Sequence, residues 1–214
     1  MTPTLDAPAP GRTRRNRGSE LVRSRLVAAA IGEFSAHGFE GASTRAIADQ
    51  ADAHQSQIKY HFDTKEELWR RCLDQLLAEV DIAIAEQPGV GSDDPRDVIE
   101  SLIRGLVAFA AARPELNRIM MHEATSPSSR LTWLVENRLA QRRSDLLAAW
   151  NELVSTGQAA PVDADVLYHT LIGAASLLYA NAPEAVLMGI QPNDPDVIQR
   201  HADGLVAMFL RPNT

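Results

Sequence analysis

The segment 43–68 constrains the fold of this chain more than any other part of the sequence. Two short stretches, 43–51 and 55–61, each place apolar residues on one side at helical spacing, and Asp52 stands between them. A third helical pattern begins at Thr64 without an intervening loop. Two short helices joined by a tight turn and followed at once by a longer helix form the pattern of a helix-turn-helix. The inward-facing residues of the two short helices are Ile47, Ala48, Ala51, Ile58 and Phe62.

Local signals mark the boundaries of these helices. Ser43 is a suitable N-cap for the first, because its hydroxyl can accept a hydrogen bond from a free backbone N–H. Asp52 stands where the backbone often turns left-handed, and aspartate tolerates that conformation better than most side chains. Thr64 and Glu67 form a Thr-x-x-Glu capping box, which predicts the start of a long helix reaching about Glu86. The apolar stripe of that helix consists of Leu68, Trp69, Cys72, Leu73, Leu76, Leu77 and Val80.

The chain before this segment divides into a tail and a helix. Residues 1–18 combine prolines and glycines with charged residues and contain little apolar surface, so we expect them to be disordered. Residues 19–37 have the spacing of an amphipathic helix, and Gly38 follows as its C-terminal cap. The buried face of this predicted helix comprises Val22, Leu26, Ala29, Ala30 and Phe34.

Every segment after the loop 87–94 has a helical pattern. Asp94-Pro95 and Asp194-Pro195 each place a capping residue before a proline at the first helical position. Because no segment shows sustained strand alternation, we predict an all-α fold of about nine helices. Its parts are a basic tail (1–18), a three-helix head (19–65) and a helical body (66–214). The predicted helices of the body after the loop are 95–113, 114–124, 130–155, 163–180 and 195–210, with a further turn at 184–188.

The net charge of −7 is divided unevenly along the chain. Residues 1–65 hold nine Arg or Lys against seven Asp or Glu, a balance of +2, which leaves −9 for the other 149 residues. Six arginines precede or begin the first helix, and Glu20 is the only acid among them. They form either a phosphate-facing region attached to an acidic body or a solvated basic tail. These arginines are Arg12, Arg14, Arg15, Arg17, Arg23 and Arg25.

Several classes of protein are disfavoured by the composition. The single cysteine, Cys72, excludes an internal disulfide framework and a multi-cysteine metal site, and we expect a buried, inert thiol. No apolar run has the length of a bilayer span and the N-terminus lacks the apolar core of a signal peptide, so we expect a cytoplasmic protein. Without a phosphate-binding glycine loop or a nucleophile motif, we predict neither an enzyme nor a cofactor. The run 120–123 and His169 lack a second well-spaced ligand pair and therefore do not predict a metal.

The order of elements, a three-helix head followed by a larger helical body, resembles the TetR family of bacterial transcriptional regulators. The similarity of motifs covers about residues 21–73, whereas the body fits only by the number and length of its helices. The resemblance implies a DNA-binding head and a body that pairs with a second copy and senses a ligand. The most specific matches are Gly38-Phe39, Ser43-Thr44, Ile47-Ala48, Tyr60-His61-Phe62 and Thr64-Lys65-Glu66-Glu67-Leu68.

In such a head, the second short helix enters the major groove and its first residues meet base edges. Gln55, Gln57 and Lys59 are the predicted base-reading residues, because Gln pairs with adenine and Lys donates to guanine. Arg45 is expected to reach either a base or a phosphate. Predicted phosphate contacts are Thr44, Tyr60, His61 and Lys65, with Thr44 helped by its position at a helix N-terminus.

Each of these residues also has a purely structural interpretation. His61 either contacts a phosphate or packs beneath the helix that starts at Thr64. Gln55, Gln57 and Lys59 could simply form a solvated helix face. The chain also departs from the family pattern: Asp52-Ala53-His54 stands where Gly-Val-Ser is common, and Lys59 where tyrosine is usual. Lys59 therefore suggests a different operator preference.

The resemblance implies that helices 163–180 and 195–210 pair with their symmetry mates in a four-helix bundle. Their apolar faces and the small-residue run 173–176 agree with this arrangement, and the alternative is that both faces pack within one chain. A two-fold dimer would place two recognition helices ~34–36 Å apart and predicts a near-palindromic operator.

A ligand pocket is expected between the helices of the body. Suitable residues combine apolar bulk with a few polar groups, although each would also serve in an ordinary core. The candidates are Phe109, Met120, His122, Trp133, Tyr168 and Tyr179.

The sequence thus predicts a homodimeric transcriptional repressor that binds double-stranded operator DNA and is released by an unidentified small-molecule effector. Binding in the body would move the long helix 64–86 and change the spacing of the recognition helices. One alternative is an activator or a regulator controlled by a protein partner. A helical enzyme is the second alternative, and no catalytic motif supports it.

Overall fold

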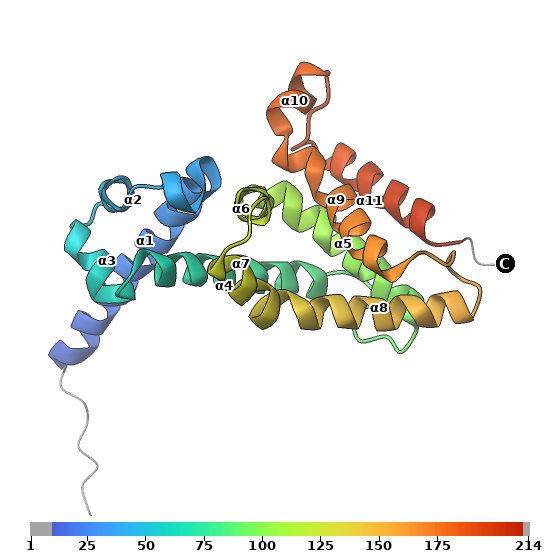
Figure 1. Ribbon diagram of the computed structural model, residues 1–214, viewed down its shortest axis with the longest axis horizontal. Coiled ribbons are helices and arrows are strands. Elements are labelled where there is room, and N and C mark those ends of the chain that lie inside the picture. Colours follow the sequence, from blue (N-terminus) through green and yellow to red (C-terminus); the bar gives the residue numbers. More distant parts are fainter. Residues whose placement is uncertain (1–9, 212–214) are drawn as a thin grey trace, which may run out of the picture. The chain divides into compact units, whose positions relative to one another are not determined.

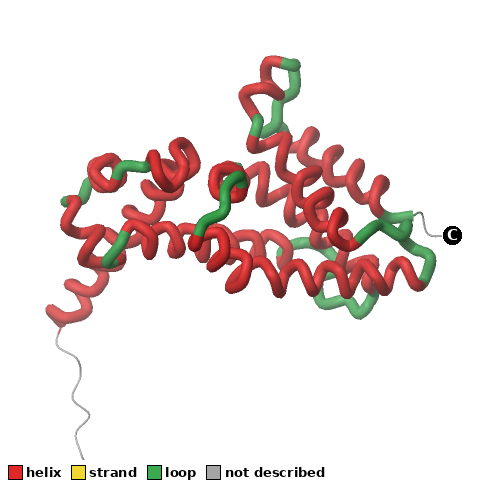
Figure 2. Tube along the Cα trace, viewed as in Figure 1, coloured by secondary structure: helices red, strands yellow, loops and turns green. Residues whose placement is uncertain are grey.

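The computed structural model describes residues 10–211, and Figures 1 and 2 show that this part of the chain is built from helices. Apart from one isolated antiparallel bridge between Ala159 and Leu210, the described residues contain no β-structure. The all-α prediction is confirmed. The elements are α1 (Pro10–Gly41), α2 (Thr44–Gln50), α3 (Gln55–Phe62), α4 (Lys65–Ala85), α5 (Pro95–Ala112), α6 (Glu115–Ala124), α7 (Ser129–Leu134), the π-helix η1 (Val135–Leu139), α8 (Ala140–Ser155), α9 (Ala164–Ala180), α10 (Ala182–Leu187) and α11 (Pro195–Phe209).

The start of α1 differs from the prediction. We expected disorder through residue 18, but the helix begins at Pro10, while residues 1–9 lie outside the described part. Proline is well suited to the first turn of a helix, and arginine has a high helix propensity. Extending a helix that is already packed also avoids the cost of nucleation. The prediction of disorder rested on the low apolar content of the tail and took no account of this effect.

The chain divides into two compact units, the first ending at Cys72 and the second beginning at Leu73. The division falls within α4, after its first two turns, and not after Lys65 as the sequence suggested. Trp69 explains the difference, because its ring is buried and contacts Phe39 edge-on in the first unit, 6.2 Å between centroids. The opening of α4 is thus part of the head.

The core of the first unit is formed by residues on the predicted apolar faces of α1 to α4. Cys72 is fully buried and its thiol lies 3.7 Å from the Val27 carbonyl. Burial raises the pKa of this thiol, so the thiolate is disfavoured. The core residues include Leu26, Ala30, Phe34, Ile47, Ala48, Ile58, Phe62, Leu68 and Trp69.

In the second unit, α5 packs against α8, α9 and α11. Both predicted Asp-Pro starts are confirmed: Asp94 accepts a hydrogen bond from the Arg96 N–H, and Asp194 accepts one from the Asp196 N–H, each at 2.9 Å. The shared core contains Ile99, Ile103, Val107, Leu146, Trp150, Leu153, Leu167, Leu171, Tyr179, Ala202 and Leu205.

The predicted helix 130–155 contains an irregularity that the sequence did not reveal. Its middle, Val135–Leu139, is a π-helix joining α7 to α8. Here the Asn137 side chain donates a 2.8 Å hydrogen bond to the Trp133 carbonyl. In a regular helix this carbonyl would accept a hydrogen bond from a backbone N–H. Counting α7, η1 and α8 as one run, the described chain has ten helices, because α10 occupies much of the predicted connection.

Candidate functional site

The turn between α2 and α3 has the geometry expected of a helix-turn-helix. Ser43 caps α2 by accepting a 3.3 Å hydrogen bond from the Ala46 N–H. Asp52 has φ of 49°, as the left-handed prediction required, and Arg25 donates to its carbonyl over 3.3 Å. An aspartate thus takes the strained position where glycine would be least costly. The turn holds α2 and α3 in a fixed relation.

One face of α3 is open to solvent. Gln55 and Lys59 are exposed, Gln57 is half-buried, and Tyr60 is 78% exposed. Ile58 and Phe62 face the core, which forces the intervening polar residues outward. Three predicted base-reading residues therefore share one helix, although Gln57 is less accessible than the other two.

Thr44 and Gln55 lie at the first turns of α2 and α3 and touch each other. The Gln55 amide donates a 2.9 Å hydrogen bond to Thr44 Oγ1. Arg45 extends into solvent, 83% exposed, with only a 4.0 Å contact to Asp49 one turn later. Two side chains predicted to contact DNA are thus joined, and a third is free to reorient.

His61 and Lys65 occupy more enclosed positions. His61 is half-buried and its ring contacts Tyr60 edge-on at 4.9 Å. Burial lowers the pKa of His61, as does the nearby Arg23, while Glu20 opposes them. The neutral imidazole is favoured, which leaves one N–H for donation. Lys65 Nζ lies 4.8 Å from the centre of the Phe39 ring, a cation–π contact.

Glu33 supports the candidate site and was not predicted from the sequence. It is almost fully buried on α1 and accepts a 2.9 Å hydrogen bond from the backbone N–H of Ser43. This contact holds the residue that caps α2, close to the predicted phosphate contact Thr44. The available signal was an acid on the apolar side of the first helix, since buried acids in proteins have partners.

The capping box at the start of α4 is half confirmed. The Glu67 N–H donates to Thr64 Oγ1 over 3.0 Å, as predicted. The Thr64 N–H donates instead to the Phe62 carbonyl at 2.6 Å, and the Glu67 carboxylate lies 4.0 Å from Arg70. Thr64 therefore caps α4 without the reciprocal bond from Glu67.

The second unit contains a partly open cavity of about 580 Å³. Most of its wall is aliphatic and comes from the helices α4 to α9 and from η1. Arg113, Asn117, Arg142, Tyr168, His169 and Ser176 supply its polar side chains. The apolar wall includes Leu77, Val80 and Ile84 of α4, Leu102, Leu106 and Phe109 of α5, Met120 of α6, Leu131 of α7, Leu146 of α8 and Ile172 of α9.

Three of the six predicted pocket residues, Phe109, Met120 and Tyr168, line this cavity. The other three lie elsewhere. His122 is exposed on α6, and Trp133 stacks beneath the Arg138 guanidinium at 4.9 Å. Tyr179 is buried with its hydroxyl 3.0 Å from His201 Nδ1. Composition suggested all six, but helix rotation decides which of them face the cavity.

Two arginines of the wall were not anticipated. Arg113 forms an ion pair with Glu79 and lies 3.4 Å from a carboxylate oxygen of Glu115. Arg142 binds both carboxylate oxygens of Asp81, one of them at 2.7 Å. Both arginines are thus neutralised by acids, and Glu79 and Asp81 belong to α4.

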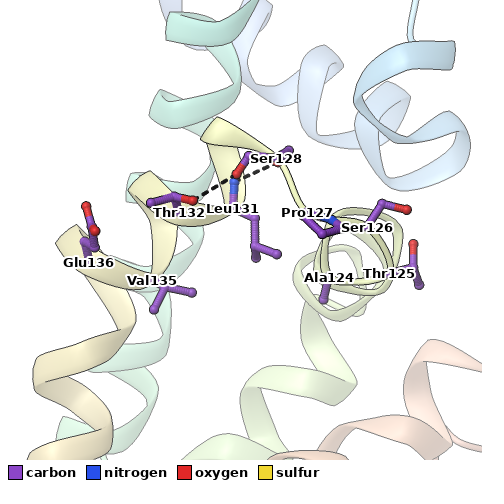
Figure 3. Close-up of a pocket in the computed structure, with 9 residues that line it drawn as sticks. All are labelled: Ala124, Thr125, Ser126, Pro127, Ser128, Leu131, Thr132, Val135 and Glu136. Carbon is purple, nitrogen blue, oxygen red and sulfur yellow. Dashed lines mark hydrogen bonds between the residues drawn. The ribbon is translucent and has the colours of Figure 1, made fainter.

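An open depression of about 400 Å³ adjoins the cavity (Figure 3). Leu131 and Val135 lie on one side of the depression, and the loop after Ala124 lies on the other. Ala124, Leu131 and Val135 also line the cavity. Ser128 caps α7 by accepting from the Leu131 N–H at 2.9 Å, and its hydroxyl donates to the buried Glu123. The depression and the cavity therefore share part of their wall.

Among the side chains that the structure describes, those of residues 18–163 and 166–211, no group of three or more His, Cys, Asp or Glu could hold a metal ion. None of the helices in the described ranges is long and apolar enough to cross a membrane.

Comparisons with known proteins agree with this geometry. Residues 26–72 match the family described as bacterial regulatory proteins, tetR family. The HTH-type transcriptional repressor SCO4008 of Streptomyces coelicolor is 32% identical over 107 residues, 50% of this chain and 52% of that protein. The chain thus matches about half the length of that repressor. The HTH-type transcriptional regulator RutR of Escherichia coli O157:H7 is 28% identical over 177 residues, 80% of each chain.

Solved structures show the same fold over both units. HlyIIR, a hemolysin II transcriptional regulator, superposes with a TM-score of 0.65 at 17% identity, covering 87% of this chain and 97% of its own. AibR, solved with isovaleryl coenzyme A and operator DNA, has a TM-score of 0.65 at 19% identity, covering 90% and 100%. At these identities the likeness establishes the fold.

Proposed function

Because this chain belongs to the TetR family of bacterial transcriptional regulators, we propose that it is a ligand-responsive repressor. It binds a near-palindromic operator as a homodimer and leaves the DNA when a small molecule fills the cavity of the second unit. The observation that carries the proposal is the exposed face of α3 next to a helix-turn-helix turn, with Gln55, Lys59 and Tyr60 open to solvent. In this role the protein has no catalytic activity.

The DNA contacts divide into two groups. Gln55, Gln57 and Lys59 read base edges in the major groove, and Arg45 assists from α2. Thr44, Tyr60, His61 and Lys65 bind phosphates and fix the orientation of the head. The exposed Tyr60 supports this assignment, because its hydroxyl can donate a hydrogen bond to a phosphate oxygen.

The homodimer forms through α9 and α11. Val166, Leu177 and Met208 of these helices are exposed apolar side chains, which a partner copy would cover. The small-residue run on α9 supports the interface less than expected, because Ala175 and Ser176 are buried within the chain.

Effector binding reaches the head through α4. Leu77, Val80 and Ile84 line the cavity, and the first turns of the same helix belong to the DNA-binding unit. A ligand that fits one position of α4 better than another shifts the population between them and lowers operator affinity.

An exposed apolar surface favours a second candidate, control by a protein partner. Leu187 of α10 is 90% exposed, and Val186, Met188 and Ile190 beside it are also open to solvent. In that case a protein docking on α10 would regulate DNA binding, as repressor or activator, without a small ligand.

Selection of bound fragments from genomic DNA, followed by affinity measurements on the selected site, tests the proposal. Lys59→Ala should weaken binding, while Gln141→Ala on an exposed position of α8 should not. Sequence-independent binding by the unmutated protein would contradict operator recognition. A co-purified small molecule that lowers the affinity would favour the cavity over a protein partner.

A further inference from the structure

The charges around the cavity indicate which molecules it accepts. Its two permanently charged side chains, Arg113 and Arg142, are each neutralised by at least one carboxylate. The formal charges of Arg142 and Asp81 sum to zero. Those of Arg113, Glu79 and Glu115 sum to −1. The wall therefore offers no uncompensated positive charge to an anion.

An anionic ligand would have to replace one of these acids. Taking Arg142 from Asp81 would break a pair held through both carboxylate oxygens and leave Asp81 without its partner. Placing the anion beside Arg113 would add a third negative group there. A neutral ligand needs neither change, and the aliphatic wall favours apolar surface.

Tyr168 provides a polar contact that is still available. Among the described residues, its hydroxyl has no hydrogen-bond partner. Burial raises the pKa of Tyr168, while Arg142 and Arg143 oppose this effect, so the hydroxyl remains a donor at neutral pH. By contrast, Ser176 already donates to the Ile172 carbonyl at 2.7 Å, and Asn117 is directed at the Met121 sulfur.

We propose that the cavity binds an electrically neutral, largely apolar molecule whose single acceptor group takes a hydrogen bond from Tyr168. This inference rests on the proposed function and specifies the class of its effector. A volume of about 580 Å³ lies within the ~300–1,000 Å³ that is usual for small-molecule sites.

Decanamide and decanoate form a matched pair of probes, because they share one shape and differ in charge. Calorimetric titration of the full chain at pH 8 without DNA should show decanamide binding at least about tenfold more tightly, a difference of about 1.4 kcal/mol. Tyr168→Phe should weaken decanamide binding about fivefold, since a net hydrogen bond is lost. Ser155→Ala, which removes an exposed hydroxyl on α8, should leave it unchanged.

Asp81→Asn tests the role of charge neutralisation directly. It removes the negative partner of Arg142 with little change in shape, so it should shift the preference towards decanoate. Retained helicity of each variant by circular dichroism excludes a folding defect.

Binding of decanoate as tight as decanamide, or an unchanged preference in Asp81→Asn, would overturn the inference. Operator binding is measured separately, so neither of these results would contradict the DNA-binding part of the proposed function. If neither probe bound, the neutral-ligand site and the effector-sensing part of the proposed function would both be rejected. Loss of operator recognition with retained decanamide binding would reject the DNA-binding part of the proposed function and would leave the neutral-ligand site standing.

Discussion

The Gln55 side-chain amide donates a 2.9 Å hydrogen bond to Thr44 Oγ1 and so links the first turn of α3 to the first turn of α2. Both side chains lie on the surface proposed to contact DNA. The bond restricts the rotamers of Gln55 before DNA arrives, while the second N–H and the carbonyl of its amide remain available for adenine. In the proposed complex, Thr44 would thereby influence base reading by Gln55 without touching a base.

Removing the acceptor should therefore weaken operator binding through Gln55. We expect Thr44→Val and Gln55→Ala each to lower affinity, and the double variant to lose less than the sum, with a coupling of about 1 kcal/mol. Fluorescence anisotropy on the selected operator at one salt concentration measures all four proteins. Strict additivity of the two losses would show that the bond has no part in recognition.

Signals confined to a few neighbouring residues predicted much of the head correctly. The Ser43 cap, the left-handed Asp52 and the Thr64 start all depend on local backbone geometry, which the sequence encodes directly. Glu33 was missed because its partner, the Ser43 N–H, is ten residues away and belongs to the residue that caps another helix.

The cavity was less predictable for a related reason. Phe109, Met120 and Tyr168 line one cavity, as do Arg113 and Arg142, which were not among the predicted pocket residues. Glu79 lies 34 residues from Arg113 and Asp81 lies 61 residues from Arg142, and such long-range pairs depend on how helices are rotated and offset. The π-helix at Val135–Leu139 adds to the difficulty, because it changes which residues of the following helix face inward.

Asp52 provides a test of backbone strain in the turn. Because its φ is 49°, Asp52→Gly should be more stable than Asp52→Ala by about 1 kcal/mol, as glycine has no Cβ to clash. Asp49 lies within α2, where the order should reverse and alanine should exceed glycine by about 1 kcal/mol. Urea unfolding of the four variants measures both differences. The same order at both positions would contradict a left-handed requirement at Asp52.

Gly105 marks a close approach between α5 and α4. A Cβ at this position would lie 2.6 Å from Ile84 Cα, so Gly105→Ala must displace one of the helices. We expect destabilisation by about 1–3 kcal/mol despite alanine's better helix propensity. Gly32→Ala in α1, where nothing lies within 4 Å, should instead stabilise. Thermal unfolding compares the two, and a stabilised Gly105→Ala would refute the close contact.

His201 joins α9 to α11 through both ring nitrogens. Its Nε2 lies 3.0 Å from the Ala174 carbonyl, which can only accept, so Nε2 carries the hydrogen and Nδ1 accepts from the Tyr179 hydroxyl 3.0 Å away. Protonation would give the ring a second hydrogen, on Nδ1, which would then face the hydroxyl hydrogen that Tyr179 now donates. Burial lowers the pKa of His201, although the bond to Ala174 opposes this effect.

This lowered pKa makes stability depend on pH. The unfolded histidine, with a pKa of about 6.5, takes up its proton before the folded one does as the pH falls. The stabilisation from this site is therefore complete above the unfolded pKa and is lost progressively below it.

His201→Gln removes the titrating group, so the free energy of unfolding should fall less steeply between pH 7.5 and 5.5 than in the unmutated protein. Urea unfolding at several pH values gives the two slopes, in which the contributions of the other five histidines cancel. Equal slopes would mean that His201 has the same proton affinity in both states, and a steeper slope in the variant would mean that folding favours the charged ring.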